Sequence, residues 1–142
     1  MKPKNYLMTL LTLSTLTLYG QTKKCDETNF HSISEKVGKL TQNEIADFLL
    51  TFGEECRNNV EYSELSNELL FKLLDKQTEL TLKTIEKEES KIELKTILED
   101  LEEPISYTPD FKKLLTKINA VSVNDKLKGQ VIERLKTADE KY

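Results

Sequence analysis

The sequence predicts an all-α protein, and three observations carry this prediction. Apolar side chains recur at the i, i+3, i+4 and i+7 spacing of one helix face, and no period-2 run of strand length competes with them. Gly and Pro are scarce, at 4 and 3 of 142 residues, which argues against a β-sandwich with its frequent turns. Charged residues make up 32% of the chain and hydrophobic residues 37%, as expected for a helical domain that faces water. The length suffices for one modest core.

An N-terminal signal peptide is predicted over residues 1–20. Lys2 and Lys4 form a basic start, and a Leu-rich apolar run follows them. This run is shorter than the roughly 17–25 apolar residues of a spanning helix, and hydroxyl side chains interrupt it. Gly20 is a small residue suited to cleavage, so the mature protein is expected to begin at Gln21.

The predicted leader implies export, either to the periplasm or out of the cell, with no stable membrane span after cleavage. The alternatives are an uncleaved anchor and a lipoprotein linked through Cys25, although Lys23 and Lys24 precede that cysteine where small apolar residues are usual. The leader contributes two lysines and no acid, so its removal changes the formal charge from −4 to −6. Such a charge repels nucleic acid and anionic lipid at long range, and we do not expect nucleic acid as a partner.

Cys25 and Cys56 are the only two cysteines, and both lie in the predicted mature chain. In an oxidising compartment such a pair is expected to form a disulfide, which closes a loop of about 31 residues and stabilises the fold by roughly 3.5–4 kcal/mol. A redox site would call for C-x-x-C spacing, and a metal site for more ligands than two cysteines and one histidine. The pair is therefore interpreted as structural.

Two parts are expected in the mature chain: an N-terminal segment with a short helix over 21–40, and a helical domain over 41–142. Helix starts are indicated by residues with the spacing of a capping box, in which each side chain bonds the other's backbone N–H. The three clear boxes are Ser32–Glu35, Thr41–Glu44 and Ser90–Glu93, the weaker versions are Asn58–Glu61 and Ser122–Asp125, and Thr108-Pro109-Asp110 places a cap before a first-turn proline.

Six amphipathic helices follow from these starts. Gly53 is expected to end the first, and Pro104 must follow the end of the fourth. The apolar faces in chain order are Ile45, Phe48, Leu49 and Phe52; Leu65, Leu69, Leu70, Leu73 and Leu74, on a helix from about Asn59; Leu80, Leu82 and Ile85; Leu94, Ile97, Leu98 and Leu101; Phe111, Leu114, Leu115 and Ile118; and Leu127, Val131, Ile132 and Leu135.

Two helices fall in each of the stretches 41–77, 78–107 and 108–139, so the chain is expected to form about three consecutive helical hairpins. Units of this length are at the short end of the range of repeat lengths in helical-repeat proteins, and three is the smallest number of repeats that buries a continuous core. The architecture is therefore similar to a short HEAT- or TPR-like stack, without the residue consensus of either. An orthogonal helical bundle is the alternative.

A cluster of carboxylates is the main candidate for a functional surface. Glu61, Glu64 and Glu68 share one face of the second expected helix, and Glu54 and Glu55 precede it in an expected loop. Such a cluster can dock a basic partner or coordinate Ca²⁺, but no compact Asp/Asn-rich, Gly-centred loop accompanies it. Acids near a helix N-terminus are also favourable with the helix dipole without any ligand.

Nothing in the sequence nominates a catalytic site. His31 is the only histidine, expected in a loop or helix entry, and no Gly-rich phosphate loop, nucleophile elbow or C-x-x-C pair is present. We therefore expect a small exported binding module that is not an enzyme, has no cofactor and recognises an unknown protein of basic character. The alternatives are an inhibitor or immunity-type protein that masks a basic toxin or enzyme, and a carboxylate-lined ligand or metal binder.

Overall fold

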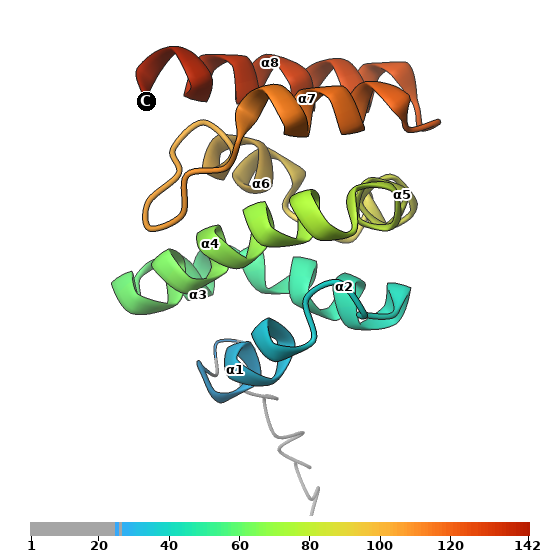
Figure 1. Ribbon diagram of the computed structural model, residues 1–142. Coiled ribbons are helices and arrows are strands. Elements are labelled where there is room, and N and C mark those ends of the chain that lie inside the picture. Colours follow the sequence, from blue (N-terminus) through green and yellow to red (C-terminus); the bar gives the residue numbers. More distant parts are fainter. Residues whose placement is uncertain (1–24, 26) are drawn as a thin grey trace, which may run out of the picture.

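The computed structural model describes Cys25 and residues 27–142. The predicted signal peptide and its cleavage site after Gly20 lie outside these residues. The described part of the chain is all-α and contains no strand, which confirms the predicted class (Figure 1). Its elements are α1 (Glu27–Glu35), α2 (Gln42–Leu49), a 3₁₀ turn η1 (Leu50–Phe52), α3 (Glu54–Arg57), α4 (Val60–Lys76), α5 (Thr78–Glu88), α6 (Leu94–Asp100), α7 (Phe111–Ala120) and α8 (Asp125–Lys141).

The six amphipathic helices expected from the sequence correspond to α2 and α4 to α8. One element was missed: Glu54 and Glu55 begin the single-turn helix α3 instead of lying in a loop. Four residues carry too little periodicity to reveal a helix, and the preceding Gly53 was interpreted only as a stop. In the structure Gly53 both ends η1 and serves as the N-cap position of α3.

One of the three clear capping boxes is present, at the start of α2. The Glu44 N–H donates to Thr41 Oγ1 at 3.3 Å, and the Thr41 N–H donates to Glu44 Oε2 at 2.8 Å. The box predicted at Ser32 is wrong because this residue lies in the middle of α1. The one predicted at Ser90 is also wrong, since α6 begins after Glu93 and no side chain caps it.

The three remaining caps are each displaced along the chain by one or two residues. Asn59, and not Asn58, caps α4 by accepting the Tyr62 N–H at 3.2 Å. Asp110 takes the place expected for Thr108 at the start of α7, and Asn124 that expected for Ser122 at the start of α8. Neighbouring cap-forming residues compete for one position, and the packing of the helix decides between them.

Helix α4 lies at the centre of the molecule, with α1 and α3 below it and α7 and α8 above it in the view of Figure 1, and it contacts α1, α3 and α5. Helix α5 also contacts α2 and α7, and α8 lies against both α6 and α7. Because of its central place, α4 buries side chains on most of its circumference. The completely buried large side chains include Ile45, Phe48, Leu49, Tyr62, Leu70, Phe71, Leu73, Leu74, Leu82, Ile85, Ile97 and Leu101.

Two side-chain amides connect α4 to distant backbone. Asn67, only 1% exposed, donates from Nδ2 to the carbonyls of Asp100 and Glu103 at 3.0 and 3.1 Å, and its Oδ1 accepts the Ile105 N–H at 3.0 Å. Gln77, at the end of α4, donates to the Leu40 carbonyl at 2.8 Å and accepts the N–H groups of Gly38 and Leu40. These amides fix the chain after α6 and the chain before α2 onto the central helix.

The turn before α2 requires a glycine at position 38. Gly38 has φ of +98°, a region that side-chain-bearing residues rarely adopt. We expect Gly38→Ala to lower the free energy of unfolding by about 1–2 kcal/mol through backbone strain. The space itself is sufficient, because an added Cβ would lie 3.8 Å from the Lys76 Cβ. Urea unfolding followed by circular dichroism measures the change.

The matched control for this substitution is Gly129→Ala, inside α8. An added Cβ there meets no atom within 4 Å, so the alanine should stabilise the helix by about 0.5–1 kcal/mol. Equal effects of the two substitutions would contradict the strained turn at Gly38.

Candidate functional site

Cys25 and Cys56 are joined by a disulfide, as predicted. Cys56 is buried in α3, with 1% of its surface exposed, whereas Cys25 is half-buried and packs against the edge of the core. The bond spans 31 positions of the sequence and fixes the start of α1 against α3. It therefore holds two short helices that would be marginal by themselves.

Four of the five carboxylates predicted as a partner surface lie together in sequence and are exposed. Glu54 and Glu55 are in α3, Glu61 is in the first turn of α4, and Glu64 lies one turn further along. We call these four residues the acidic face. Within residues 54–64 the one cationic side chain is Arg57, and its guanidinium is paired with Glu99 Oε2 at 3.5 Å.

Val60 lies between Glu55 and Glu61 in the sequence and is 72% exposed, the highest value among the large apolar side chains of the described residues. It follows Asn59, which caps α4, and precedes Glu61. Its backbone is therefore held at the start of a packed helix. An exposed apolar side chain therefore directly precedes an exposed glutamate at the start of α4.

Glu68, the fifth predicted carboxylate, has a different environment. It is half-buried, forms an ion pair with Lys72 one turn later, and borders a hollow of about 130 Å³ between α1 and α4. The helical spacing correctly places it on the same helix as Glu61 and Glu64. The cover provided by α1 comes from a distant part of the chain and separates Glu68 from them.

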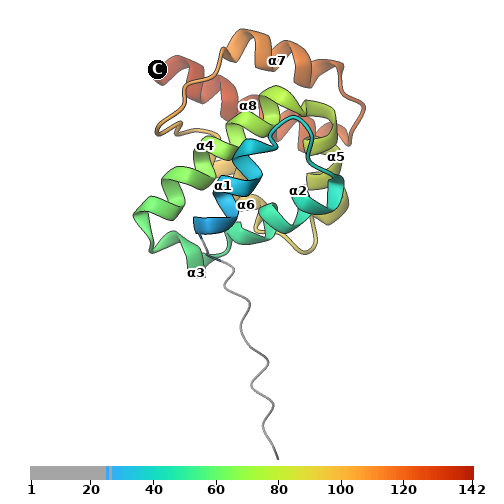
Figure 2. The ribbon, with the colours of Figure 1, turned by 60° about the horizontal axis from the view of Figure 1, so that its bottom comes forward.

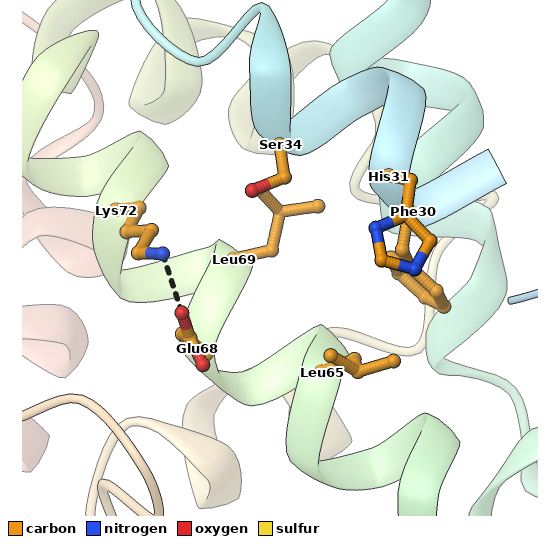
Figure 3. Close-up of a pocket in the computed structure, with 7 residues that line it drawn as sticks. All are labelled: Phe30, His31, Ser34, Leu65, Glu68, Leu69 and Lys72. Carbon is orange, nitrogen blue, oxygen red and sulfur yellow. Dashed lines mark hydrogen bonds and ion pairs between the residues drawn. The ribbon is translucent and has the colours of Figure 1, made fainter. Parts of the chain in front are cut away.

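The hollow beneath α1 combines an apolar floor with polar side chains at its edge (Figure 3). Helix α1 contributes His31 and Ser34, and α4 contributes Glu68 and Lys72, whose ammonium also lies 5.9 Å from the centre of the Tyr107 ring. His31 was expected in a loop or helix entry but lies within α1. Among the described side chains no hydrogen bond joins His31 to Ser34 or to Glu68. The hollow is lined by Phe30, His31, Ser34, Leu65, Glu68, Leu69 and Lys72.

A second, wider hollow of about 670 Å³ lies between the start of α5 and the end of α7. Three lysines border it, and each is paired with a carboxylate: Lys117 Nζ lies 2.7 Å from Asp75 Oδ1, Lys76 pairs with Asp75 and Lys83 with Glu79. The hydrogen bond from Lys117 lowers the pKa of the Asp75 carboxyl. No sequence pattern indicates this hollow, because its lysines come from three separate helices.

Asp100, at the end of α6, has a raised carboxyl pKa. Burial raises its pKa from 3.8 to about 6, against the attraction of Arg57. It borders a small recess of about 20 Å³ next to Cys56, together with the side chains of Thr96 and Tyr62. Ionisation of Asp100 therefore disfavours the folded state near neutral pH.

The sign of this effect gives a pH-dependent prediction. Protonated Asp100 stabilises the fold fully below about pH 4, and this contribution is lost as the pH rises through about 6. Asp100→Asn, which stays neutral, should therefore raise the free energy of unfolding at pH 7.5 by about 1–2 kcal/mol, after allowance for partial exposure. At pH 4 the two proteins should be equally stable.

Urea unfolding at the two pH values makes the comparison. Asp139→Asn, at an exposed position near the end of α8, is the matched control and should change stability by less than about 0.5 kcal/mol. A stabilisation by Asp100→Asn that is as large at pH 4 as at pH 7.5 would contradict the raised pKa.

Within residues 27–142 and Cys25, no group of three or more His, Cys, Asp or Glu side chains is arranged to hold a metal ion. No helix in this part of the chain has the length and apolar character needed to cross a membrane. Comparisons with models of protein families, with curated proteins and with solved structures find no match for the chain.

Proposed function

We propose that this protein is an exported binding module whose acidic face docks onto a positively charged protein, and that it performs no catalysis itself. The observation that carries the proposal is the exposure of Glu54, Glu55, Glu61 and Glu64 on rigidly held helices. Charge on an exposed face speeds encounter with an oppositely charged partner and excludes wrong partners.

Preorganisation is the second argument for docking. The disulfide fixes α3 through Cys56, and Tyr62 is buried in the core just one residue after Glu61. A surface whose backbone is already fixed loses little conformational entropy when it binds. Val60, exposed and next to Glu61 in the sequence, offers an apolar contact beside these charges, and protein interfaces commonly combine apolar and polar contacts.

Two alternatives remain within the proposal. An inhibitor or immunity-type protein that masks a basic toxin or enzyme would use the same face in the same way. A carboxylate-lined ligand or metal binder would need several carboxylates that converge. Glu68 is the member of the predicted set that borders a hollow, and its charge is balanced by Lys72. Because the predicted carboxylates do not converge on one hollow, they favour docking of a partner over binding of a ligand or metal ion.

We also infer export, with a mature chain that begins at Gln21, from the basic and apolar pattern of residues 1–20. The Cys25–Cys56 disulfide is of the kind that persists in oxidising compartments.

For the finer architecture we favour an orthogonal bundle over a HEAT- or TPR-like stack. Helix α2 packs on α5, and α6 on α8, so these contacts join helices from different expected hairpins. The pair α4 and α5 also crosses an expected hairpin boundary, at residue 77. A repeat stack would rely first on pairing within each hairpin.

Site-specific photo-crosslinking tests the docking proposal. A photoreactive phenylalanine analogue at Val60 should give one specific adduct in the native compartment, with a protein of net positive charge. Tyr142, 66% exposed at the end of α8, provides the matched control position and should give no such adduct. An adduct formed equally from both positions, or an acidic protein captured from position 60, would contradict the proposal.

A further inference from the structure

Ile105 is an exposed apolar side chain in the loop between α6 and α7. With 54% of its surface in water, it is one of four large apolar side chains that are exposed among the described residues. The loop itself does not stand away from the protein, because Pro104 and Pro109 are buried and Tyr107 is half-buried against the core. Ile105 is therefore exposed at the surface of a packed loop.

The backbone of Ile105 is fixed to α4 by the buried amide of Asn67. The Oδ1 atom of Asn67 accepts the Ile105 N–H at 3.0 Å, and its Nδ2 atom donates to the Glu103 carbonyl at 3.1 Å. The ring of Pro104 restricts the backbone between these two hydrogen bonds. A side chain on such a backbone costs little conformational entropy when a partner covers it.

The same side of α4 carries Val60 and Glu64. Positions 60, 64 and 67 have the i, i+4, i+7 spacing of one helix face, over about 10 Å of the helix axis. Val60 and Glu64 are exposed, whereas Asn67 holds the loop, which runs beside α4 (Figures 1 and 2). Two of the four exposed apolar residues, Val60 and Ile105, therefore lie on one side of α4 with Glu64 between them.

We infer that Ile105 is an apolar anchor of the docking surface, and that the partner receives it in an apolar pocket edged by Lys or Arg. This role of Ile105 rests on the proposed function and adds the chemistry of the partner's binding site. Charge complementarity favours a basic edge, because the exposed Glu64 lies one helical turn before the residue that holds Ile105. Burial of the isoleucine in the pocket removes apolar surface from water and stabilises the complex.

Ile105 and the glutamates are expected to act on different rates. The charges of Glu54, Glu61 and Glu64 attract a basic protein through the solvent, so they act on association. The isoleucine side chain acts over contact distance alone, so its loss should speed dissociation of the complex and leave association nearly unchanged. The two rates therefore separate the anchor from the steering by the acidic face.

Binding kinetics of the whole exported protein, with its disulfide intact, test the anchor. The binding partner is the purified protein that crosslinks at position 60, and surface plasmon resonance gives both rates at about 150 mM salt. Ile105→Ala should dissociate at least about tenfold faster than the wild type, while its association rate stays within about twofold. Ile105→Val, which keeps most of the apolar side chain, should dissociate less than about threefold faster. Leu50→Ala, the matched control at another exposed aliphatic position, should leave both rates unchanged.

Failure of the anchor differs from failure of the proposed function. If a basic partner is captured at position 60 but dissociates from Ile105→Ala as slowly as from the wild type, the anchor is overturned and the docking face stands. Slower association of Ile105→Ala without faster dissociation also overturns the anchor. If position 60 captures no basic protein, the proposed function and the anchor fall together. Because Ile105 is exposed, Ile105→Ala should unfold at the wild-type urea concentration, so faster dissociation would not reflect a lost fold.

Discussion

Replacing Asn67 by alanine should lower the free energy of unfolding by about 2–4 kcal/mol. The substitution removes an amide that bonds two carbonyls and one N–H of the chain at Asp100, Glu103 and Ile105. Because Asn67 is only 1% exposed, these three bonds are made inside the protein, and the backbone groups lose that partner when the amide is removed. Urea unfolding measures the loss, and hydrogen exchange should show that residues 101–110 lose protection first.

Asn119→Ala is the matched control. Asn119 is exposed on α7 and makes one local hydrogen bond, from its Nδ2 to the Leu115 carbonyl at 2.8 Å. Its replacement should change stability by less than about 0.5 kcal/mol. An Asn67→Ala protein as stable as Asn119→Ala would contradict the role assigned to the buried amide.

The second large effect is expected from removal of the disulfide. Cys25→Ser/Cys56→Ser should lower the free energy of unfolding by about 3–4 kcal/mol, because the unfolded chain regains the entropy of an open loop of 31 residues. The folded double variant should keep its helical bundle, so its circular dichroism signal at 222 nm should be only slightly weaker than that of the wild type.

Reduced and alkylated wild-type protein provides the control for the serine side chains and should unfold at the same urea concentration as the double variant. A loss of stability below about 1 kcal/mol would indicate that the bond constrains little in the unfolded chain. Loss of most of the helical signal would show that the core cannot form without it.

Much of the fold could be predicted because helical periodicity is a local property. The apolar faces of α2 and of α4 to α8 are legible within single stretches of the chain. The exact cap positions are harder to predict. Asn58 and Asn59 are equivalent as cap residues in the sequence, and the burial of Tyr62 selects Asn59. Helix α3 is too short for any period to be visible.

The candidate site could be predicted where it depends on composition or helical spacing. Two cysteines allow one intramolecular pairing, and Glu61 and Glu64 follow the turn of α4. The separate environment of Glu68 depends on α1, which packs on α4 from some thirty positions away in the sequence. The raised pKa of Asp100 also depends on contacts between distant segments.

Asn67 carried a signal that could have been used. It lies three residues before Leu70 and four before Phe71, so the helical period places it on the buried stripe of α4. A polar residue on such a stripe must find partners for its amide. Which backbone groups serve as those partners depends on the course of the chain after α6.

We propose that the acidic face steers a basic partner, and the association rate with the protein crosslinked at position 60 is the decisive measurement. The variant Glu54→Lys/Glu61→Lys/Glu64→Lys is compared with Asp125→Lys/Glu133→Lys/Glu140→Lys, which makes the same change of charge on exposed residues of α8, at the opposite end of the molecule (Figures 1 and 2). We expect the first variant to associate at least about tenfold more slowly at 10 mM salt, and the difference to shrink at 150 mM as the Debye length falls from about 30 to about 8 Å. Equal rates for the two folded variants at low salt would contradict the claim.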